Sequence, residues 1–236
     1  MMRFTDELRR IADPVFEAII QHPFVQGIGR GELDKEQLIH YVKQDFEYLN
    51  VFMRIYGLGI SKCQNREDIA FFHEKIGFIL DSETHPHHNF CRVAGVTYEE
   101  LQGYPLAPTA THYTRHMLAV AHGGTLGELL AVLLPCPWVY FEVGLRLIEQ
   151  YRPEKDHPFY EWIMFYGDQP MVPRVESFRN RLDRCAENAS KEEKARMIDH
   201  FVKSCQLEYL FFDMAYKLED WPVQVPEVAV SASDGQ

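Results

Sequence analysis

Three long apolar stretches of the chain each carry one reactive side chain at mid-length. The residue is Asp45 in the segment 35–61, Cys136 in the segment 126–150 and Glu208 in the segment 191–217. A thiolate can attack an electrophilic carbon, and a carboxylic acid in apolar surroundings can keep a proton near neutral pH and deliver it. If the three segments are helices that pack together, these side chains can meet in one interior pocket for a small molecule.

The spacing of the neighbours places each reactive group on an apolar helix face, because they recur at intervals of three and four residues. These neighbours are Leu38, Val42, Leu49, Phe52 and Tyr56 for Asp45; Phe201, Cys205, Phe212 and Ala215 for Glu208; and Leu129, Val132, Tyr140, Val143 and Leu147 for Cys136. Each group also has a structural alternative, namely an inert core thiol for Cys136 and a core salt bridge for either acid. The coincidence of three such residues favours the shared pocket.

Two prolines, Pro135 and Pro137, flank the cysteine. Proline disfavours helical geometry in the residue before it, so Leu134 and Cys136 should both leave the helix. Either the helix kinks sharply here, or a new helix begins at Pro137 with Cys136 at its cap. A helix start favours the thiolate through its unpaired N–H groups and positive dipole end.

The elements that must position these groups are helices. Helical spacing recurs almost throughout the chain and strict alternation is scarce, which predicts an all-α bundle. The expected helices cover about 4–21, 35–61, 66–83, 109–122, 126–150, 157–166, 171–187 and 191–217, and Pro23 and Pro158 each fit a first helical position. With 236 residues, 46% of them hydrophobic, residues 1–221 should form one domain, and residues 222–236 should be a flexible tail.

Composition excludes several classes of protein. The net charge of −11 and the absence of a dense basic run argue against nucleic-acid and anionic-membrane partners. The most apolar run, 129–141, is shorter than the ~20 residues of a membrane span. Five scattered cysteines without a CxxC pair predict reduced thiols in a cytoplasm and no structural zinc. The stretch "SETHPHHNF" is either a metal site or, as we expect, a polar loop or helix end with cationic histidines.

Five blocks that occur in order between residues 22 and 216 resemble the TenA family of thiaminase II or aminopyrimidine aminohydrolase enzymes. They are "HPFVQGIGRGEL", "YVKQDFEYL", "LLPCPWVYFEVG", "WIMFYG" and "EYLFFDMAY". The resemblance implies a haem-oxygenase-like all-α fold without haem, metal or other cofactor, assembled as a homotetramer. It also implies salvage of the thiamine pyrimidine, in which 4-amino-5-aminomethyl-2-methylpyrimidine, or thiamine itself, gives the hydroxymethylpyrimidine.

The resemblance also implies roles for individual residues. The nucleophile of the family falls on Cys136, its pocket carboxylates on Asp45 and Glu208, and its pocket aromatics on Tyr48, Tyr113, Tyr140, Tyr166 and Phe211. We expect Glu208 to be the acid and base at the pyrimidine ring and Asp45 to accept from the ring amino group. Pro137 departs from the family pattern, which has another residue after the cysteine.

Two other classes of function stay open at this point. An oxygenase on the same bundle would need an axial histidine or a set of Glu and Glu-x-x-His ligands, and the sequence offers neither. A non-catalytic pyrimidine-binding or regulatory protein would need no nucleophile. Amino- and formylaminopyrimidines are alternative substrates that the sequence does not separate.

Overall fold

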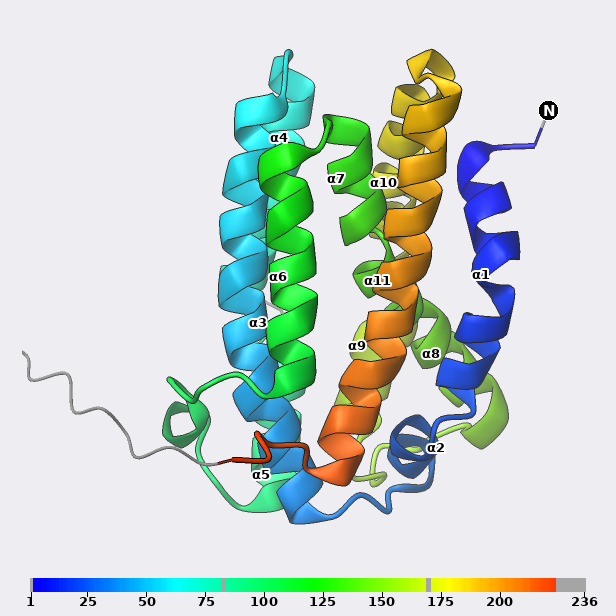
Figure 1. Ribbon diagram of the computed structural model, residues 1–236. Helices are drawn as coiled ribbons and strands as arrows, with labels where there is room; N and C mark the ends of the chain where they lie inside the picture. The colour runs from blue at the N-terminus through cyan, green and yellow to red at the C-terminus, as the bar shows by residue number, and fades with distance from the viewer. Residues whose placement is uncertain (1, 82–83, 169–170, 224–236) are drawn as a thin grey trace, which may run out of the picture.

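The computed structural model describes residues 2–81, 84–168 and 171–223, and every regular element in these ranges is helical (Figure 1). The elements are α1 (Phe4–Ile20), α2 (Pro23–Arg30), α3 (Lys35–Lys62), α4 (Arg66–Asp81), α5 (His85–Ala94), the 3₁₀ turn η1 (Glu99–Leu101), α6 (Pro108–Gly123), α7 (Leu126–Leu133), α8 (Pro135–Tyr151), α9 (Tyr160–Gly167), α10 (Met171–Asn188) and α11 (Lys191–Lys217). The predicted all-α class is therefore confirmed. The predicted tail begins with Pro222 and Val223, and its residues 224–236 lie outside the described part.

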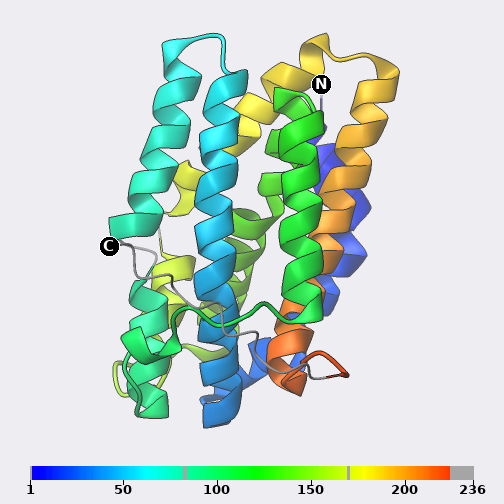
Figure 2. The same ribbon diagram turned by 60° about the vertical axis from the view of Figure 1, so that its left-hand side comes forward.

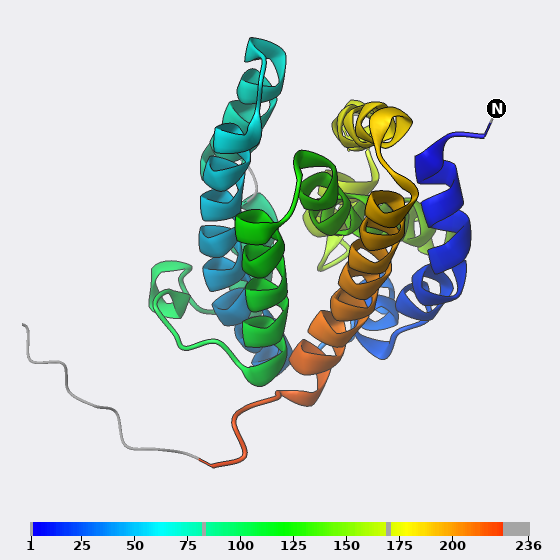
Figure 3. The same cartoon turned by 45° about the horizontal axis from the view of Figure 1, so that its top comes forward.

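The two longest helices, α3 and α11, form the centre of the bundle. They contact each other; α3 also packs against α4, α5 and α6, and α11 against α1, α6, α7 and α8. Figures 1 and 2 show α3, α4, α6 and α11 running along the long axis, and Figure 3 shows the same helices from nearer their ends. Because α3 and α11 are in contact, their inward faces can bring Asp45 and Glu208 into one core.

Two helices, α2 and α5, are absent from the ranges expected from the sequence, although a first helical position was predicted at Pro23. Helix α2 begins at Pro23, in the first helical position predicted for it, and ends at Gly31, whose φ of 71° lies in the left-handed region that favours glycine. Helix α5 contains Pro86, which looks like a helix breaker. Pro86 occupies the first turn, however, where a helix needs no N–H donor. The corresponding prediction for Pro158 is wrong, because α9 begins only at Tyr160.

The predicted helix 126–150 is divided in two at the proline pair. Helix α8 begins at Pro135 with Leu134 as its cap, so Cys136 is its second residue, and the alternative of a helix that begins at Pro137 with Cys136 as its cap is wrong. Leu134 also keeps helical angles (φ −60°, ψ −35°), contrary to expectation. The Trp138 N–H donates to the Leu134 carbonyl at 3.3 Å. Of the first three residues of α8, Pro135 and Pro137 have no N–H, so only Cys136 has a backbone donor that lacks a place in the helix pattern. The helix can therefore start inside the core with few N–H groups to satisfy.

The joined stretch Leu126–Tyr151 is long and apolar enough to cross a membrane by length and composition. In the bundle, however, 78% of its most apolar window is buried by other parts of the protein. We therefore assign it as the core helix pair of a globular bundle.

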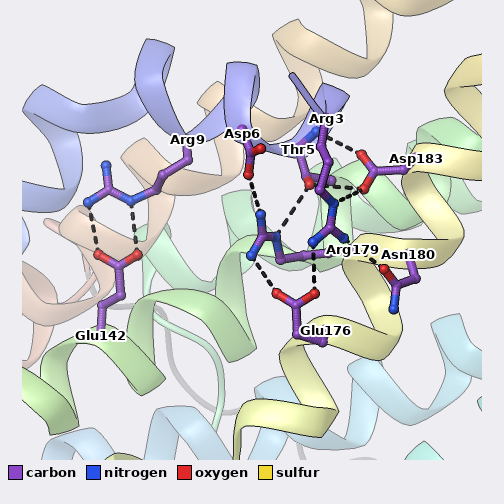
Figure 4. A network of polar contacts seen from close by, with 9 residues as sticks. All are labelled: Arg3, Thr5, Asp6, Arg9, Glu142, Glu176, Arg179, Asn180 and Asp183. Atoms are coloured by element: carbon purple, nitrogen blue, oxygen red, sulfur yellow. Dashed lines mark hydrogen bonds and ion pairs between the residues drawn. The ribbon is translucent and has the colours of Figure 1, made fainter. Parts of the chain in front are cut away.

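A set of ion pairs fastens the first helix to the rest of the bundle (Figure 4). Arg9 binds Glu142 of α8 through two parallel hydrogen bonds of 2.9 and 2.8 Å. Arg3 reaches Glu176 at 2.8 Å and Asp183 at 2.7 Å, both on α10. We call the nine residues of this set the outer ion network: Arg3, Thr5, Asp6, Arg9, Glu142, Glu176, Arg179, Asn180 and Asp183.

Candidate active site

All eight residues predicted for the site lie in the core, and none is more than 8% exposed. Asp45 and Tyr48 come from α3, Tyr113 from α6, Cys136 and Tyr140 from α8, Tyr166 from α9, and Glu208 and Phe211 from α11. Five helices that are far apart in the sequence thus contribute to one interior. All eight lie in one interior, while the shared pocket and the role of each residue stay predictions.

Glu208 is a buried acid with an unusual affinity for its proton. Its carboxyl accepts a hydrogen bond of 2.7 Å from the hydroxyl of Tyr113. Burial raises its pKa to about 8; the Tyr113 bond opposes this rise, and the charge of Asp45 adds to it. The pKa moves in the direction that the apolar stripe predicts. Near neutral pH Glu208 is therefore mostly a neutral acid that can give a proton.

Aromatic rings line the core around Glu208. The ring of Tyr48 lies 5.2 Å from that of Tyr113 and 5.3 Å from that of Phe211, measured between centroids. Burial raises the pKa of both tyrosines well above the usual range, and the charge of Cys136 adds to the rise at each. Their hydroxyls therefore stay protonated beside the thiol, and their faces offer a stacking surface for a flat ring.

A close helix contact positions a second pair of tyrosines. Helices α8 and α9 approach until a Cβ on Gly144 would collide with the backbone of Gly167. This approach leaves the rings of Tyr140 and Tyr166 only 4.8 Å apart. The Tyr140 hydroxyl shares a hydrogen bond of 2.6 Å with that of Tyr41, which the sequence analysis missed. Tyr41 lies one turn before Asp45 on α3, so its position on the same face was the available signal.

Cys136 lies between this interior and the surface. It borders a small cavity of about 30 Å³ between α3, α4, α8 and α10, which is lined by Phe52, Tyr56, Lys75, Phe78, Cys136, Pro137, Met171, Arg174 and Phe178. The cavity shares Lys75, Phe78 and Arg174 with a wider groove between α4 and α10. A space of that size holds about one water molecule, so a pyrimidine ring must displace side chains to reach the thiol from this side.

Asp45 has a partner that the sequence analysis did not identify. Its Oδ2 lies 2.7 Å from Nε2 of His87, a residue of α5 that is 1% exposed. In place of the predicted polar loop or helix end, the stretch begins helix α5, and His87 is buried there whereas His85 and His88 are exposed. Glu83, also in that stretch, lies outside the described residues. In the part of the chain that the structure describes, no three His, Cys, Asp or Glu side chains gather as metal ligands would.

Comparison with known proteins gives consistent matches over nearly the whole chain. The model of the TENA/THI-4/PQQC family matches residues 9–218. A protein of Halalkalibacterium halodurans named aminopyrimidine aminohydrolase is 36% identical over 221 residues, which cover 93% of this chain and 98% of that protein.

Two solved structures agree with the fold. A TenA homologue from P. horikoshii OT3 superposes with a TM-score of 0.80 at 26% identity, covering 92% of this chain and 99% of the other. A Shewanella denitrificans domain with a haem oxygenase-like fold gives 0.68 at 12% identity, covering 91% and 92%, and so bears on the fold alone.

Proposed function

The chain belongs to the TENA/THI-4/PQQC family, and on that premise we propose that it is an aminopyrimidine aminohydrolase of thiamine salvage. It converts 4-amino-5-aminomethyl-2-methylpyrimidine and water into the hydroxymethylpyrimidine and ammonia. The observation that supports this most strongly is the presence in one core of a thiol at a helix start, a carboxyl group with a pKa of about 8 and a set of closely packed aromatic rings. A binding protein would need neither the thiol nor the acid.

The proposed reaction proceeds through a covalent adduct. The sulfur of Cys136 forms a bond to an electrophilic ring carbon while Glu208 gives its proton to a ring nitrogen. The aminomethyl group reacts as its ammonium form, so the bond between the methylene and its nitrogen breaks and ammonia leaves with the electron pair. Water adds to the methylene and gives one proton to solvent, the ring N–H returns its proton to Glu208, and the carbon–sulfur bond breaks to release the hydroxymethylpyrimidine and the Cys136 thiolate. One substitution is thereby divided into steps with lower barriers.

The remaining residues bind and orient the ring in this proposal. Asp45 accepts a hydrogen bond from the ring amino group, a charge-assisted contact that fixes which ring edge faces Glu208. The rings of Tyr48 and Phe211 stack on the pyrimidine, and the hydroxyls of Tyr140 and Tyr166 hold ring nitrogens or the attacking water. Tyr113, which donates to Glu208, fixes the orientation of that carboxyl group.

Replacement of the nucleophile tests the proposed function. Cys136→Ala should reduce ammonia release from the aminomethylpyrimidine to background while circular dichroism and the melting temperature stay close to those of the unchanged protein. Cys63→Ala, at the end of α3 and outside the site, is the matched control and should retain activity. Turnover in Cys136→Ala near that of the control would contradict the covalent mechanism. An unchanged protein that binds the pyrimidine without releasing ammonia would contradict the enzyme assignment.

We extend the proposal to assembly and location. The resemblance to TenA proteins supports a homotetramer in the cytoplasm, with a small pyrimidine as substrate and no nucleic-acid or membrane partner. Light scattering at micromolar concentration tests the assembly: a mass of four chains supports the tetramer, and a mass of one chain contradicts it.

A further inference from the structure

A buried chain of hydrogen bonds leads away from Asp45 and has no part in the chemistry described so far. Nε2 of His87 lies 2.7 Å from Oδ2 of Asp45, and Nδ1 of the same ring lies 3.2 Å from the hydroxyl of Tyr98. The three side chains come from α3, α5 and the start of η1. They are 6%, 1% and 7% exposed, respectively, so water cannot readily replace either contact.

His87 is the only basic side chain that contacts Asp45 in the described part of the chain. Among the described groups with a shifted pKa, the charge of Asp45 acts on Tyr41, Tyr98, Tyr140 and Glu208, which are all acids. Burial is the main cause of the raised pKa of Tyr41 and Glu208, and the charge of Asp45 adds to both. An ionised Asp45 in this setting needs a donor, and His87 is the residue that provides one.

The geometry also settles which oxygen of Asp45 is occupied. Oδ2 accepts from His87, and among the described residues no side chain donates to Oδ1. Burial raises the pKa of Tyr98, so its hydroxyl keeps a proton that it can donate to Nδ1. An ionised carboxylate only accepts, so the 2.7 Å contact has Nε2 of His87 as the donor and Oδ2 of Asp45 as the acceptor. This arrangement leaves Oδ1 as the acceptor for a ligand.

Packing holds the histidine ring in this orientation. Asn89, two residues further along α5, donates to the carbonyl of Pro158 at 2.9 Å and accepts from the backbone N–H of Trp162 at 3.3 Å. Phe90 lies parallel to Trp162, with centroids 5.9 Å apart. Helix α5 is therefore fastened to α9, and His87 cannot shift toward or away from Asp45 without disturbing these contacts.

We propose that His87, oriented by Tyr98, is a positioning residue that fixes the Asp45 carboxylate so that its second oxygen receives the amino group of the pyrimidine. The inference rests on the proposed function, since it assigns the partner of Asp45 from the substrate of that reaction. His87 does not touch the substrate in this account and acts only through Asp45. A histidine that served merely to fill the core would instead affect activity only by weakening the fold.

A double-mutant cycle with conservative rescue tests the assignment. His87→Leu removes the donor and should lower kcat/KM for the aminomethylpyrimidine at least tenfold, mainly through KM. His87→Gln can place an N–H near the former Nε2 and should recover part of this loss. In an Asp45→Asn background, where the carboxylate is absent, His87→Leu should change kcat/KM by less than twofold. His88→Leu is the matched control, because His88 is exposed and its ring centroid lies 4.8 Å from that of Tyr98. This variant should leave kcat/KM unchanged.

The outcomes separate the inference from the function on which it rests. Two results with an active unchanged enzyme would overturn the positioning role alone. One is a kcat/KM of His87→Leu within twofold of the unchanged enzyme; the other is a double variant in which the losses from His87→Leu and Asp45→Asn multiply. Failure of His87→Gln to recover more activity than His87→Leu, with both variants folded by circular dichroism, would also overturn it. An unchanged protein without ammonia release would refute the proposed function, and the inference with it.

Discussion

The core around Glu208 and the outer ion network both contain acidic side chains, buried in the core and partly exposed in the network, and the two regions differ in the partners that they give these acids. In the outer network every acid contacts an arginine: Glu176 binds Arg3 and Arg179. In the core, no arginine or lysine of the described residues pairs with Asp45 or Glu208. Burial alone would raise the pKa of Glu176, yet its arginine partners more than offset this and lower it. Glu208 lacks such partners, and its pKa rises to about 8.

The difference shows where the protein secures stability and where it keeps reactivity. An acid neutralised by arginine is a fixed charge that joins helices and has no proton to give. An acid held by a tyrosine in apolar surroundings keeps a transferable proton, at a cost to stability once the pH rises. The two regions come close at Trp138, two residues after Cys136, where the Arg179 guanidinium lies 4.6 Å from the ring centroid. The ion network thus supports the helix start that carries the thiol.

The strongest test of this contrast is Glu208→Gln, which keeps an acceptor for Tyr113 but removes the proton. We expect kcat to fall about 100-fold or more, the usual effect of losing a general acid. The stability of this variant relative to the unchanged protein should instead increase as the pH rises. The folded pKa of about 8 exceeds the ordinary value of 4.5, so the group stabilises the fold fully below pH 4.5 and loses this contribution as the pH rises through 8.

The free energy of unfolding of Glu208→Gln minus that of the unchanged protein should therefore be higher at pH 7 than at pH 4, by an amount on the order of 2–4 kcal/mol. Urea denaturation of both proteins at the two pH values measures this gain. A variant that is equally destabilised at both would show that Glu208 is already ionised at pH 7.

A smaller effect is expected for Asp45→Asn, which removes a charge but keeps the size of the side chain. Pyrimidine binding should weaken more than tenfold, because a charge-assisted hydrogen bond contributes about 1.5–3 kcal/mol. The charge of Asp45 also contributes to the raised pKa of Glu208, so the alkaline limb of the pH–rate profile should move to lower pH. Calorimetric titration and a pH series measure the two effects. Unchanged affinity would remove Asp45 from the site.

The smallest effect is expected for Glu176→Gln in the outer ion network, which tests whether this network affects stability and not activity. Activity should stay within twofold of the unchanged enzyme, while stability should fall by about 1 kcal/mol, since the pairs are partly exposed and screened. The folded pKa of Glu176 is lowered, so its contribution is present above pH 4.5 and disappears as the pH falls further. Thermal melts at pH 7 and pH 3 should differ accordingly. A loss of activity without a loss of stability would contradict the division between the two regions.

The sequence predicted the groups that interrupt an apolar pattern and missed those that no pattern distinguishes. Asp45, Cys136 and Glu208 stand out because a polar residue on an apolar stripe demands a physical explanation. His87 lies among other polar residues after a proline, so its burial could be seen only once α5 was placed beside α3. The need of Asp45 for a partner, with no arginine or lysine on its own stripe, was the one available signal.

The fold shows the same limit at the proline pair. The period of the apolar residues predicted one helical stretch over 126–150, and the residues on both sides of the junction do share that pattern. The position of the helix start depends on which backbone N–H groups the prolines remove, and Leu134 stays helical although a proline follows it. A statistical preference for non-helical angles yields here to packing on both sides, because Leu133 and Leu134 are fully buried.

Glu208 holds its proton through neutral pH because, among the described residues, no lysine or arginine pairs with its carboxyl group. Infrared difference spectroscopy of the unchanged protein against Glu208→Gln, recorded from pH 4 to pH 10, isolates the carbonyl stretch of this one protonated carboxyl group. We predict that the band persists at pH 7 and disappears with a midpoint near 8. A band lost with a midpoint near 4.5, the ordinary value for glutamate, would contradict the account.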